Sequence, residues 1–192
     1  VFNSCGFKLF LIHFLVPQNI LNEESKVNPL NTYGASKLRG EEYIKESGCS
    51  YTMIRTSWVF SEFGSNFVKT MMKLSDKSSL NIVSDQFGSP TYAPDLAEVI
   101  YKCINNFKYC KNEVFHYSNS EKCSWYEFSK AIMTSLDSKT QLNPVPTSEY
   151  PTPAKRPLHS ILNTTKIKST LNIEIRSWKK ALECCIKELR NV

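Results

Sequence analysis

The sequence predicts an α/β fold built around a parallel sheet, with a smaller lobe attached. The first observation is a helix-forming segment that ends near Gly48 and is followed at once by a strand-forming run, Tyr51–Phe60. The second is that strand and helix patterns alternate along the rest of the chain. Strands separated by helices in this order usually lie parallel in one sheet. Ligands of such sheets bind at the carboxyl ends of the strands.

Length and charge set broad limits. The 192 residues are enough to bury a real core and would normally form one domain, at most with a small extra lobe. The net charge of +6 suits an anionic ligand such as a nucleotide diphosphate, but a lysine-rich drift in composition explains it equally well. No basic run carries interleaved aromatic residues, so we expect no nucleic-acid partner.

The cysteines and histidines do not predict a metal site. The 7 cysteines form no Cys-x-x-Cys pair, and the 3 histidines are scattered singly, so no zinc-binding spacing is present. An odd number of thiols without such spacing fits reduced cysteines in a cytoplasm, which is the location we expect.

The apolar run Phe7–Val16 near the N-terminus is stopped by Pro17. It is far shorter than the ~20 apolar residues of a membrane span, and it lacks the cleavage-site pattern of a signal peptide. We therefore expect a strand or a buried segment here, and no membrane association. Val1–Asn3 could close a preceding buried strand, and Glu23–Lys26 is typical of a charged surface loop.

The next segment has the clearest helix signals. Pro29 disfavours helix just before it, Asn31 or Thr32 can cap the first turn, and helix-forming residues continue through Lys45. Gly48 suits the left-handed position after the last turn. We expect one helix between these two signals.

Periodicity and chain breakers predict the later elements. They are a helix over 66–74, a strand over 80–83, a helix from 94 to 104, a strand over 114–117, a helix over 125–136 capped by Ser124, and helices over 163–171 and 178–189. Residues 84–93 form a polar loop of the type that contacts ligands. Repeated prolines keep residues 137–158 extended, and such segments often line a site.

Tyr33 and Lys37 stand four residues apart on one face of the first helix. A phenol held beside an ammonium is a proton donor with a lowered pKa, because the positive charge favours the phenolate. Tyr126 and Lys130 share this spacing, and we interpret that second pair as part of an ordinary amphipathic helix. The first pair differs because only small residues, Gly34–Ser36, separate its members, and these let a flat ligand approach.

The segment Asn28–Glu41, Asn-Pro-Leu-Asn-Thr-Tyr-Gly-Ala-Ser-Lys-Leu-Arg-Gly-Glu, closely resembles the active-site helix of the extended short-chain dehydrogenase/reductases. Within that superfamily it is most similar to the dTDP-4-dehydrorhamnose reductase family. The resemblance implies a partial Rossmann-like parallel sheet with a smaller C-terminal substrate-binding lobe. Residues 1–60 would be the C-terminal remnant of the NAD(P)-binding domain, and residues 61–192 would mainly form the sugar-nucleotide lobe.

Later segments resemble signatures of the same family in the same order, namely Ile54–Val59, Asn66–Met71, Asp85–Tyr92 and Ala154–Pro157 with Ser160 and Leu162. The resemblance implies substrate contacts from Trp58, Asn66, Gln86, Ser89, Pro90, Thr91 and Arg156. Simpler explanations stay open, namely a core tryptophan at 58, a helix cap at 66, a plain turn over 85–92 and a solvated charge at 156.

Arg156 is the phosphate candidate among these residues, because a planar guanidinium can bind phosphate oxygens through two hydrogen bonds. His159 and Asn163 stand where the family usually has Asn and Asp. No functional role is therefore carried over to those two positions.

The resemblance implies reduction of dTDP-4-dehydro-L-rhamnose to dTDP-L-rhamnose by hydride transfer from NADPH or NADH. Tyr33 would protonate the developing alkoxide at C4 of the sugar, while Lys37 lowers the pKa of Tyr33 and holds the nicotinamide ribose. Ser57, at the carboxyl end of its strand, is the third predicted cofactor contact. The implied partner is the dTDP-sugar substrate, and a homodimer and a bound Mg²⁺ ion stay open.

The glycines do not predict a dinucleotide-binding turn. All 6 are too far apart for a Gly-x-x-Gly-x-x-Gly turn that could hold a pyrophosphate on a helix N-terminus. The family places that turn in the first half of its fold, and a third catalytic residue, Ser or Thr, on a strand before Val1. We therefore expect the chain to be the C-terminal part of such an enzyme, with little or no activity by itself.

Two other functions stay open. A nucleotide-sugar epimerase or dehydratase belongs to the same superfamily, although Arg55–Trp58 and Asp85–Tyr92 argue against it. A non-catalytic regulatory subunit, similar to the β subunit of methionine adenosyltransferase, would use the fold for binding alone. The presence of both Tyr33 and Lys37 favours the enzyme.

Overall fold

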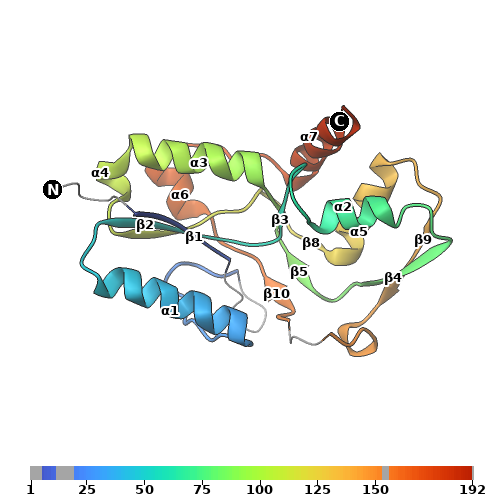
Figure 1. Ribbon diagram of the computed structural model, residues 1–192, viewed down its shortest axis with the longest axis horizontal. Coiled ribbons are helices and arrows are strands. Elements are labelled where there is room, and N and C mark those ends of the chain that lie inside the picture. The colour runs from blue at the N-terminus through green and yellow to red at the C-terminus, as the bar shows by residue number, and fades with distance from the viewer. Residues whose placement is uncertain (1–5, 12–19, 153–155, 192) are drawn as a thin grey trace.

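The computed structural model describes residues 6–11, 20–152 and 156–191. Figure 1 shows a sheet with helices on both faces at one end of the molecule and a second lobe, built from helices and a strand pair, at the other. The predicted course of residues 1–5 and 12–19, including Val1–Asn3, lies outside the described residues.

The main sheet has the strand order β1-β2-β7, and both pairings are parallel. Its strands are β1 (Gly6–Leu11), β2 (Tyr51–Thr56) and β7 (Glu113–His116). In register, Gly6 lies beside Tyr51 and Thr52 lies beside Glu113. The prediction of a parallel sheet is confirmed, and part of the apolar run near the N-terminus is one of its strands.

Helix α1 (Thr32–Glu46) packs on one face of this sheet, and its sequence signals act as predicted. The side chain of Asn31 accepts a hydrogen bond from the Gly34 amide at 2.8 Å, which satisfies a free N–H group of the first turn. At the other end, Gly48 has a left-handed backbone with φ of +68°. Local sequence alone is enough to define both ends of this helix.

The opposite face of the sheet is covered by α3 (Ala93–Asn105), α4 (Phe107–Cys110) and α6 (Thr165–Leu171), as Figure 1 shows. Their apolar side chains form one cluster with Ile54 of β2 and Phe115 of β7. Helix α4 was not expected from the sequence. Segments after residue 60 therefore contribute to both ends of the molecule, and the predicted division at residue 60 stays a prediction.

The expected strand over 51–60 is shorter in the structure, which is a correction. Strand β2 ends at Thr56, and Trp58 has a left-handed backbone with φ of 49°, which no regular strand can contain. Residues Val59–Phe60 then form a separate strand, β3, which pairs with β6 (Thr91–Tyr92).

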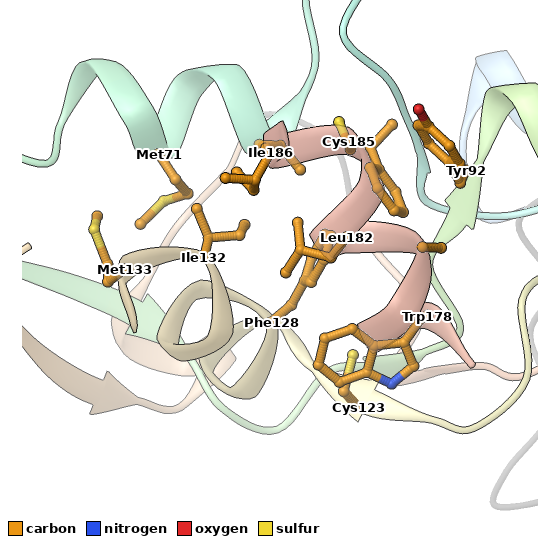
Figure 2. Packing of buried hydrophobic residues seen from close by; sticks show 13 residues of the cluster. Met71, Tyr92, Cys123, Phe128, Ile132, Met133, Trp178, Leu182, Cys185 and Ile186 are labelled. Atoms are coloured by element: carbon orange, nitrogen blue, oxygen red, sulfur yellow. The ribbon is translucent and has the colours of Figure 1, made fainter. Parts of the chain in front are cut away.

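The second lobe is built on α2 (Phe67–Lys73), α5 (Trp125–Ser135) and α7 (Trp178–Arg190). Figure 2 shows side chains of all three helices meeting in one apolar cluster, with Leu182 and Ile186 of α7 facing Ile132 of α5. Leu182 and Ile132 are almost fully buried, and burying such a side chain contributes about 1.5–3 kcal/mol. The predicted ranges of these helices are confirmed within about two residues.

The proline-rich segment contains a strand that the sequence did not predict. Residues Gln141–Val145 form β9, which pairs in parallel with β4 (Ser79–Val83), so that Pro144 lies beside Ile82. Proline is tolerated because β9 has a neighbour on one side only within the described sheet. Residues Thr147–Glu149 follow as a short 3-10 helix.

The polar loop over 84–93 is also more ordered than expected. Its residues Phe87–Gly88 form β5, which lies between β10 (His159–Ser160) and β8 (Cys123–Ser124). These three short strands connect the two ends of the molecule (Figure 1). Residues that are distant in sequence are thereby fastened together near the carboxyl end of β2.

Candidate functional site

Tyr33 and Lys37 lie on the first turns of α1, as predicted. The Lys37 ammonium stands 5.2 Å from the centre of the Tyr33 ring, and 47% of Tyr33 is exposed. Gly34 is buried between them, where an added Cβ would come within 3.3 Å of the Pro29 side chain. An ammonium and a phenol are therefore held together at a surface that a ligand can reach.

A buried ion pair attaches α1 to the sheet. Arg55 of β2 donates to both carboxylate oxygens of Glu41, at 2.9 Å and 2.7 Å, and both side chains are almost fully buried. Such a pair fixes both the position and the rotation of the helix, because its two parallel hydrogen bonds are directional. Glu41 lies about two turns along the helix from Tyr33 and about one turn from Lys37.

His116 of β7 completes this buried cluster. Its Nδ1 lies 3.1 Å from the Leu21 carbonyl, and its Nε2 lies 3.5 Å from Arg55. Burial first, and then the positive charge of Arg55, lower the pKa of His116 from 6.5 to about 4. The imidazole is therefore neutral at pH 7.

A cavity of about 390 Å³ lies in the second lobe. It is lined by residues from α2, β4, α5 and the segment after the 3-10 helix, namely Phe67, Thr70, Asn81, Ile82, Val83, Gln86, Trp125, Tyr150, Thr152 and Arg156. The structure thus brings together two of the predicted substrate residues, Gln86 and Arg156. Aromatic walls with a few polar groups and one guanidinium suit a flat, anionic ligand.

Asp85 fastens one wall of this cavity. Its carboxylate accepts hydrogen bonds from the Thr147 backbone N–H, at 2.9 Å and 3.0 Å, and from the Thr147 hydroxyl at 2.6 Å. The side-chain amide of Gln86 donates to the same hydroxyl at 3.1 Å. The chain that leads to Tyr150 is therefore fixed against the end of β4.

Trp58 lies next to the cavity and does not line it directly. Its ring is half-buried and is stacked on Trp125, with ring centres 3.6 Å apart and planes 9° from parallel. Trp125 is a cavity-lining residue, so the stacked pair of indoles extends from the cavity to the residue that follows the carboxyl end of β2 by two positions.

The other predicted substrate and cofactor residues have contacts inside the protein. Asn66 caps α2 and accepts from the Lys69 amide at 3.2 Å. Ser57 is buried and donates to the Ser89 carbonyl at 3.0 Å, and Thr91 accepts from the Thr56 hydroxyl at 3.0 Å. The Pro90 carbonyl accepts from the Asn119 amide at 3.2 Å. The described lining of the cavity does not include Ser57 or any of these four predicted substrate residues, Asn66, Ser89, Pro90 and Thr91.

Some cavity residues were not predicted from the sequence, above all Phe67, Trp125 and Tyr150. Trp125 follows the cap Ser124 and has the periodicity of a core residue, so nothing local marks it as a cavity residue. The signal for Tyr150 was the proline-rich segment, which was expected to line a site. The control pair Tyr126 and Lys130 lies on α5, whose neighbours Phe128 and Ile132 are buried as in an amphipathic helix.

No group of three or more His, Cys, Asp or Glu side chains that could hold a metal ion occurs among the described residues. The six cysteines that the structure describes are free thiols. Of the described helices, none is both long and apolar enough to cross a membrane.

Comparison with known proteins gives consistent matches. The family described as the RmlD substrate binding domain matches residues 17–191. The spore coat polysaccharide biosynthesis protein SpsK of Bacillus subtilis is 42% identical over 167 residues, which cover 86% of this chain and 57% of that protein. The dTDP-4-dehydrorhamnose reductase of Sinorhizobium fredii is 35% identical over 168 residues, covering 83% of this chain and 57% of the relative.

A solved structure agrees with these matches. The dTDP-4-dehydrorhamnose reductase of Bacillus anthracis, crystallised in complex with NADP, superposes with a TM-score of 0.84 at 35% identity. The match covers 95% of this chain and 64% of that one. The chain therefore spans less than two thirds of the length of the relatives it matches.

Proposed function

The chain belongs to the dTDP-4-dehydrorhamnose reductase family, whose substrate-binding domain it contains, and on that premise we propose that its protein reduces dTDP-4-dehydro-L-rhamnose to dTDP-L-rhamnose. The observation that carries the proposal is the pair of Tyr33 and Lys37, held 5.2 Å apart from ring centre to ammonium at an accessible surface of α1. A chain of this family that served binding alone would not need that pair.

Tyr33 is the proposed proton donor to the oxygen at C4 of the sugar. Its hydroxyl is the proton-bearing group of a partly exposed side chain, and the Lys37 ammonium lies over the same ring. The buried pair of Glu41 and Arg55 keeps this part of α1 in place during the reaction.

The nicotinamide cofactor, NADPH or NADH, would supply the hydride when bound. Lys37 and Tyr33 fit the ribose end of such a cofactor, since both present polar atoms at the surface of α1. Ser57 is the remaining proposed cofactor contact, at the carboxyl end of β2. The 6 glycines of the chain are too widely spaced to hold the pyrophosphate.

For the dTDP part of the substrate we propose the cavity of the second lobe. Arg156 would bind phosphate oxygens, Gln86 would donate to a polar edge of the ligand, and the aromatic walls would contact a flat base. Trp58 would contact the sugar from beside the cavity. For Asn66, Ser89, Pro90 and Thr91, direct substrate contacts stay predictions.

NADPH oxidation with dTDP-4-dehydro-L-rhamnose tests the proposal. The assay uses the protein together with any sequence that its gene encodes before Val1. We expect Tyr33→Phe to lower kcat by about 10²–10⁴-fold, because the proton donor is lost. Tyr126→Phe is the matched control, since Tyr126 has the same spacing to a lysine on α5, and it should leave kcat unchanged.

Two results would contradict the proposal. Full activity of the Tyr33→Phe enzyme would eliminate the proton-donor role. No NADPH oxidation by the wild-type protein, combined with epimerisation of a nucleotide sugar or with binding alone, would favour one of the two rival functions.

A further inference from the structure

Trp58 has an unusual backbone for a bulky side chain. With φ of 49° it is in the left-handed region, where the Cβ of an L-residue crowds the following carbonyl oxygen. It directly follows Ser57 at the carboxyl end of β2, where ligands of parallel sheets bind. Strain of this kind persists only where surrounding contacts hold the residue, and it is concentrated at functional sites.

Trp125 is the first of these contacts. It stacks on Trp58 with ring centres 3.6 Å apart, and Phe67 packs against it at 4.5 Å. Trp125 is itself fixed because it is the first residue of α5 and lies between Ser124 and Glu127, whose capping box closes the first turn. The indole of Trp58 therefore rests on a rigid surface.

Gly88 is the second contact, and it leaves room for the Trp58 ring because glycine has no side chain. A Cβ at Gly88 would lie 2.5 Å from Cε2 and 2.8 Å from Nε1 of Trp58, and 2.7 Å from the Ser160 hydroxyl. The backbone of Gly88 cannot retreat, because β5 is the central strand between β10 and β8. The edge of the Trp58 ring therefore fills a space that exists only with glycine at this position.

We propose that Gly88 and Trp125 are positioning residues that hold the Trp58 indole where it contacts the sugar of the nucleotide-sugar substrate. The proposal rests on the function proposed above. Trp125 supports one face of the ring and Gly88 leaves room for its edge, and together these contacts offset the left-handed backbone. Gly88 does not occur among the described lining residues of the cavity, so it acts on the ligand only through Trp58.

Binding measurements on the 192-residue chain test this separation. Isothermal titration would compare dTDP-L-rhamnose with dTDP for the wild type, Gly88→Ala, Trp58→Phe and the double variant. We expect Gly88→Ala to weaken binding of dTDP-L-rhamnose by about tenfold, the upper range for one aromatic contact, and binding of dTDP by less than about twofold. The double variant should bind dTDP-L-rhamnose no more weakly than the weaker single variant, because both changes remove the same contact.

Near-ultraviolet circular dichroism provides a readout that needs no ligand. Two stacked indoles couple their electronic transitions, so Trp58→Phe, Trp125→Phe and Gly88→Ala should all lose the same band. Trp178→Phe is the matched control, because Trp178 belongs to the same apolar cluster and packs edge-on against Phe128 at 5.5 Å. It should lower the melting temperature and keep both that band and the affinity for dTDP-L-rhamnose.

The outcomes separate the two proposals. The positioning role is wrong if Gly88→Ala keeps the band and the affinity for dTDP-L-rhamnose. It is also wrong if the loss of affinity caused by Gly88→Ala adds to the loss caused by Trp58→Phe in the double variant. If the folded wild-type chain binds neither ligand, the assignment of the cavity to the dTDP part is wrong and the positioning role falls with it, whereas the NADPH oxidation assay tests the proposed function separately. If Gly88→Ala does not fold, Trp125→Phe decides by the band and by the loss of affinity for dTDP-L-rhamnose relative to dTDP, because Trp125 itself lines the cavity.

Discussion

His116 shows how a single buried side chain makes the stability of this fold depend on pH. It is fully buried, its neighbours include Arg55 and Lys166, and its pKa is lowered to about 4, first by burial and then by the charge of Arg55. The unfolded chain binds a proton at His116 below about pH 6.5, whereas the folded chain does so only near pH 4. Between these values the unfolded state binds more protons, so the free energy of unfolding falls as the pH falls.

Substitution of His116 by Gln should remove this dependence. We expect the wild type to lose about 2 kcal/mol more than His116→Gln between pH 7 and pH 5, as calculated from the two pKa values. Urea unfolding at both pH values measures the difference, and the other titrating groups cancel because both proteins contain them. Parallel loss of stability in the two proteins would show that His116 is not the responsible group.

Arg156 is the residue that should distinguish a nucleotide diphosphate from a nucleoside. It lines the cavity and is exposed. We expect Arg156→Ala to weaken dTDP binding by about 10–100-fold, which corresponds to the loss of charge-assisted hydrogen bonds. Binding of thymidine should stay unchanged because it has no phosphate.

Calorimetric titration of both ligands measures the effect of Arg156→Ala. Arg190→Ala is the matched control, since Arg190 is an exposed arginine at the end of α7 and is not among the described lining residues of the cavity. Equal weakening of dTDP and thymidine binding would mean that Arg156 shapes the cavity and does not bind phosphate.

At the scale of elements, pairing between distant segments builds the cavity. Strand β4 contributes residues 81–83, and β9, its partner, leads into the 3-10 helix and on to Tyr150. Asp85 joins the two segments through three hydrogen bonds to Thr147. The position of this cavity wall therefore depends on the hydrogen bonds between Asp85 and Thr147.

Asp85→Ala should loosen that wall. We expect a loss of about 1–3 kcal/mol of stability, because the Thr147 donors lose their acceptor, and a measurable loss of dTDP affinity. Asp76→Ala is the control, since Asp76 is exposed and does not have a left-handed backbone, and it should change neither quantity by more than about 0.5 kcal/mol. Urea unfolding and calorimetric titration measure both effects, and unchanged dTDP affinity in Asp85→Ala would refute the role of the junction.

The whole molecule combines a helix that carries the proposed acid/base pair with a lobe that contains a cavity. The strands β5, β8 and β10 connect the two ends. Arg156 lies just before β10 in sequence, and the Trp58 ring packs against Gly88 of β5. The arrangement supports binding of the nucleotide part by the lobe and reaction near α1.

The 192-residue chain should therefore bind dTDP but oxidise NADPH at little or no rate with dTDP-4-dehydro-L-rhamnose. The physical reason is that its glycine spacing cannot form a turn for the cofactor pyrophosphate. Calorimetry with dTDP and absorbance at the NADPH band measure the two properties. Turnover by this chain equal to that of the protein with any sequence that its gene encodes before Val1 would contradict the expectation.

Local signals in the sequence determined α1, the later helices other than α4, and the parallel order of the sheet. Caps, prolines and glycines act within one turn, so Asn31, Ser124 and Gly48 could be assigned without tertiary structure. The pair of Tyr33 and Lys37 was found in the same way, because one helical turn brings its members together.

Tertiary structure alone decided the strand β9, the break at Trp58 and the cavity. β9 exists because it pairs with β4, about sixty residues away, and Pro144 hides that pairing in the sequence. Trp58 leaves the strand because Trp125 and Gly88 hold its ring, and neither is near it in sequence. Residues that meet only through long-range packing have no local pattern, which is why the sequence predicted the pair of Tyr33 and Lys37 but not the walls of the cavity.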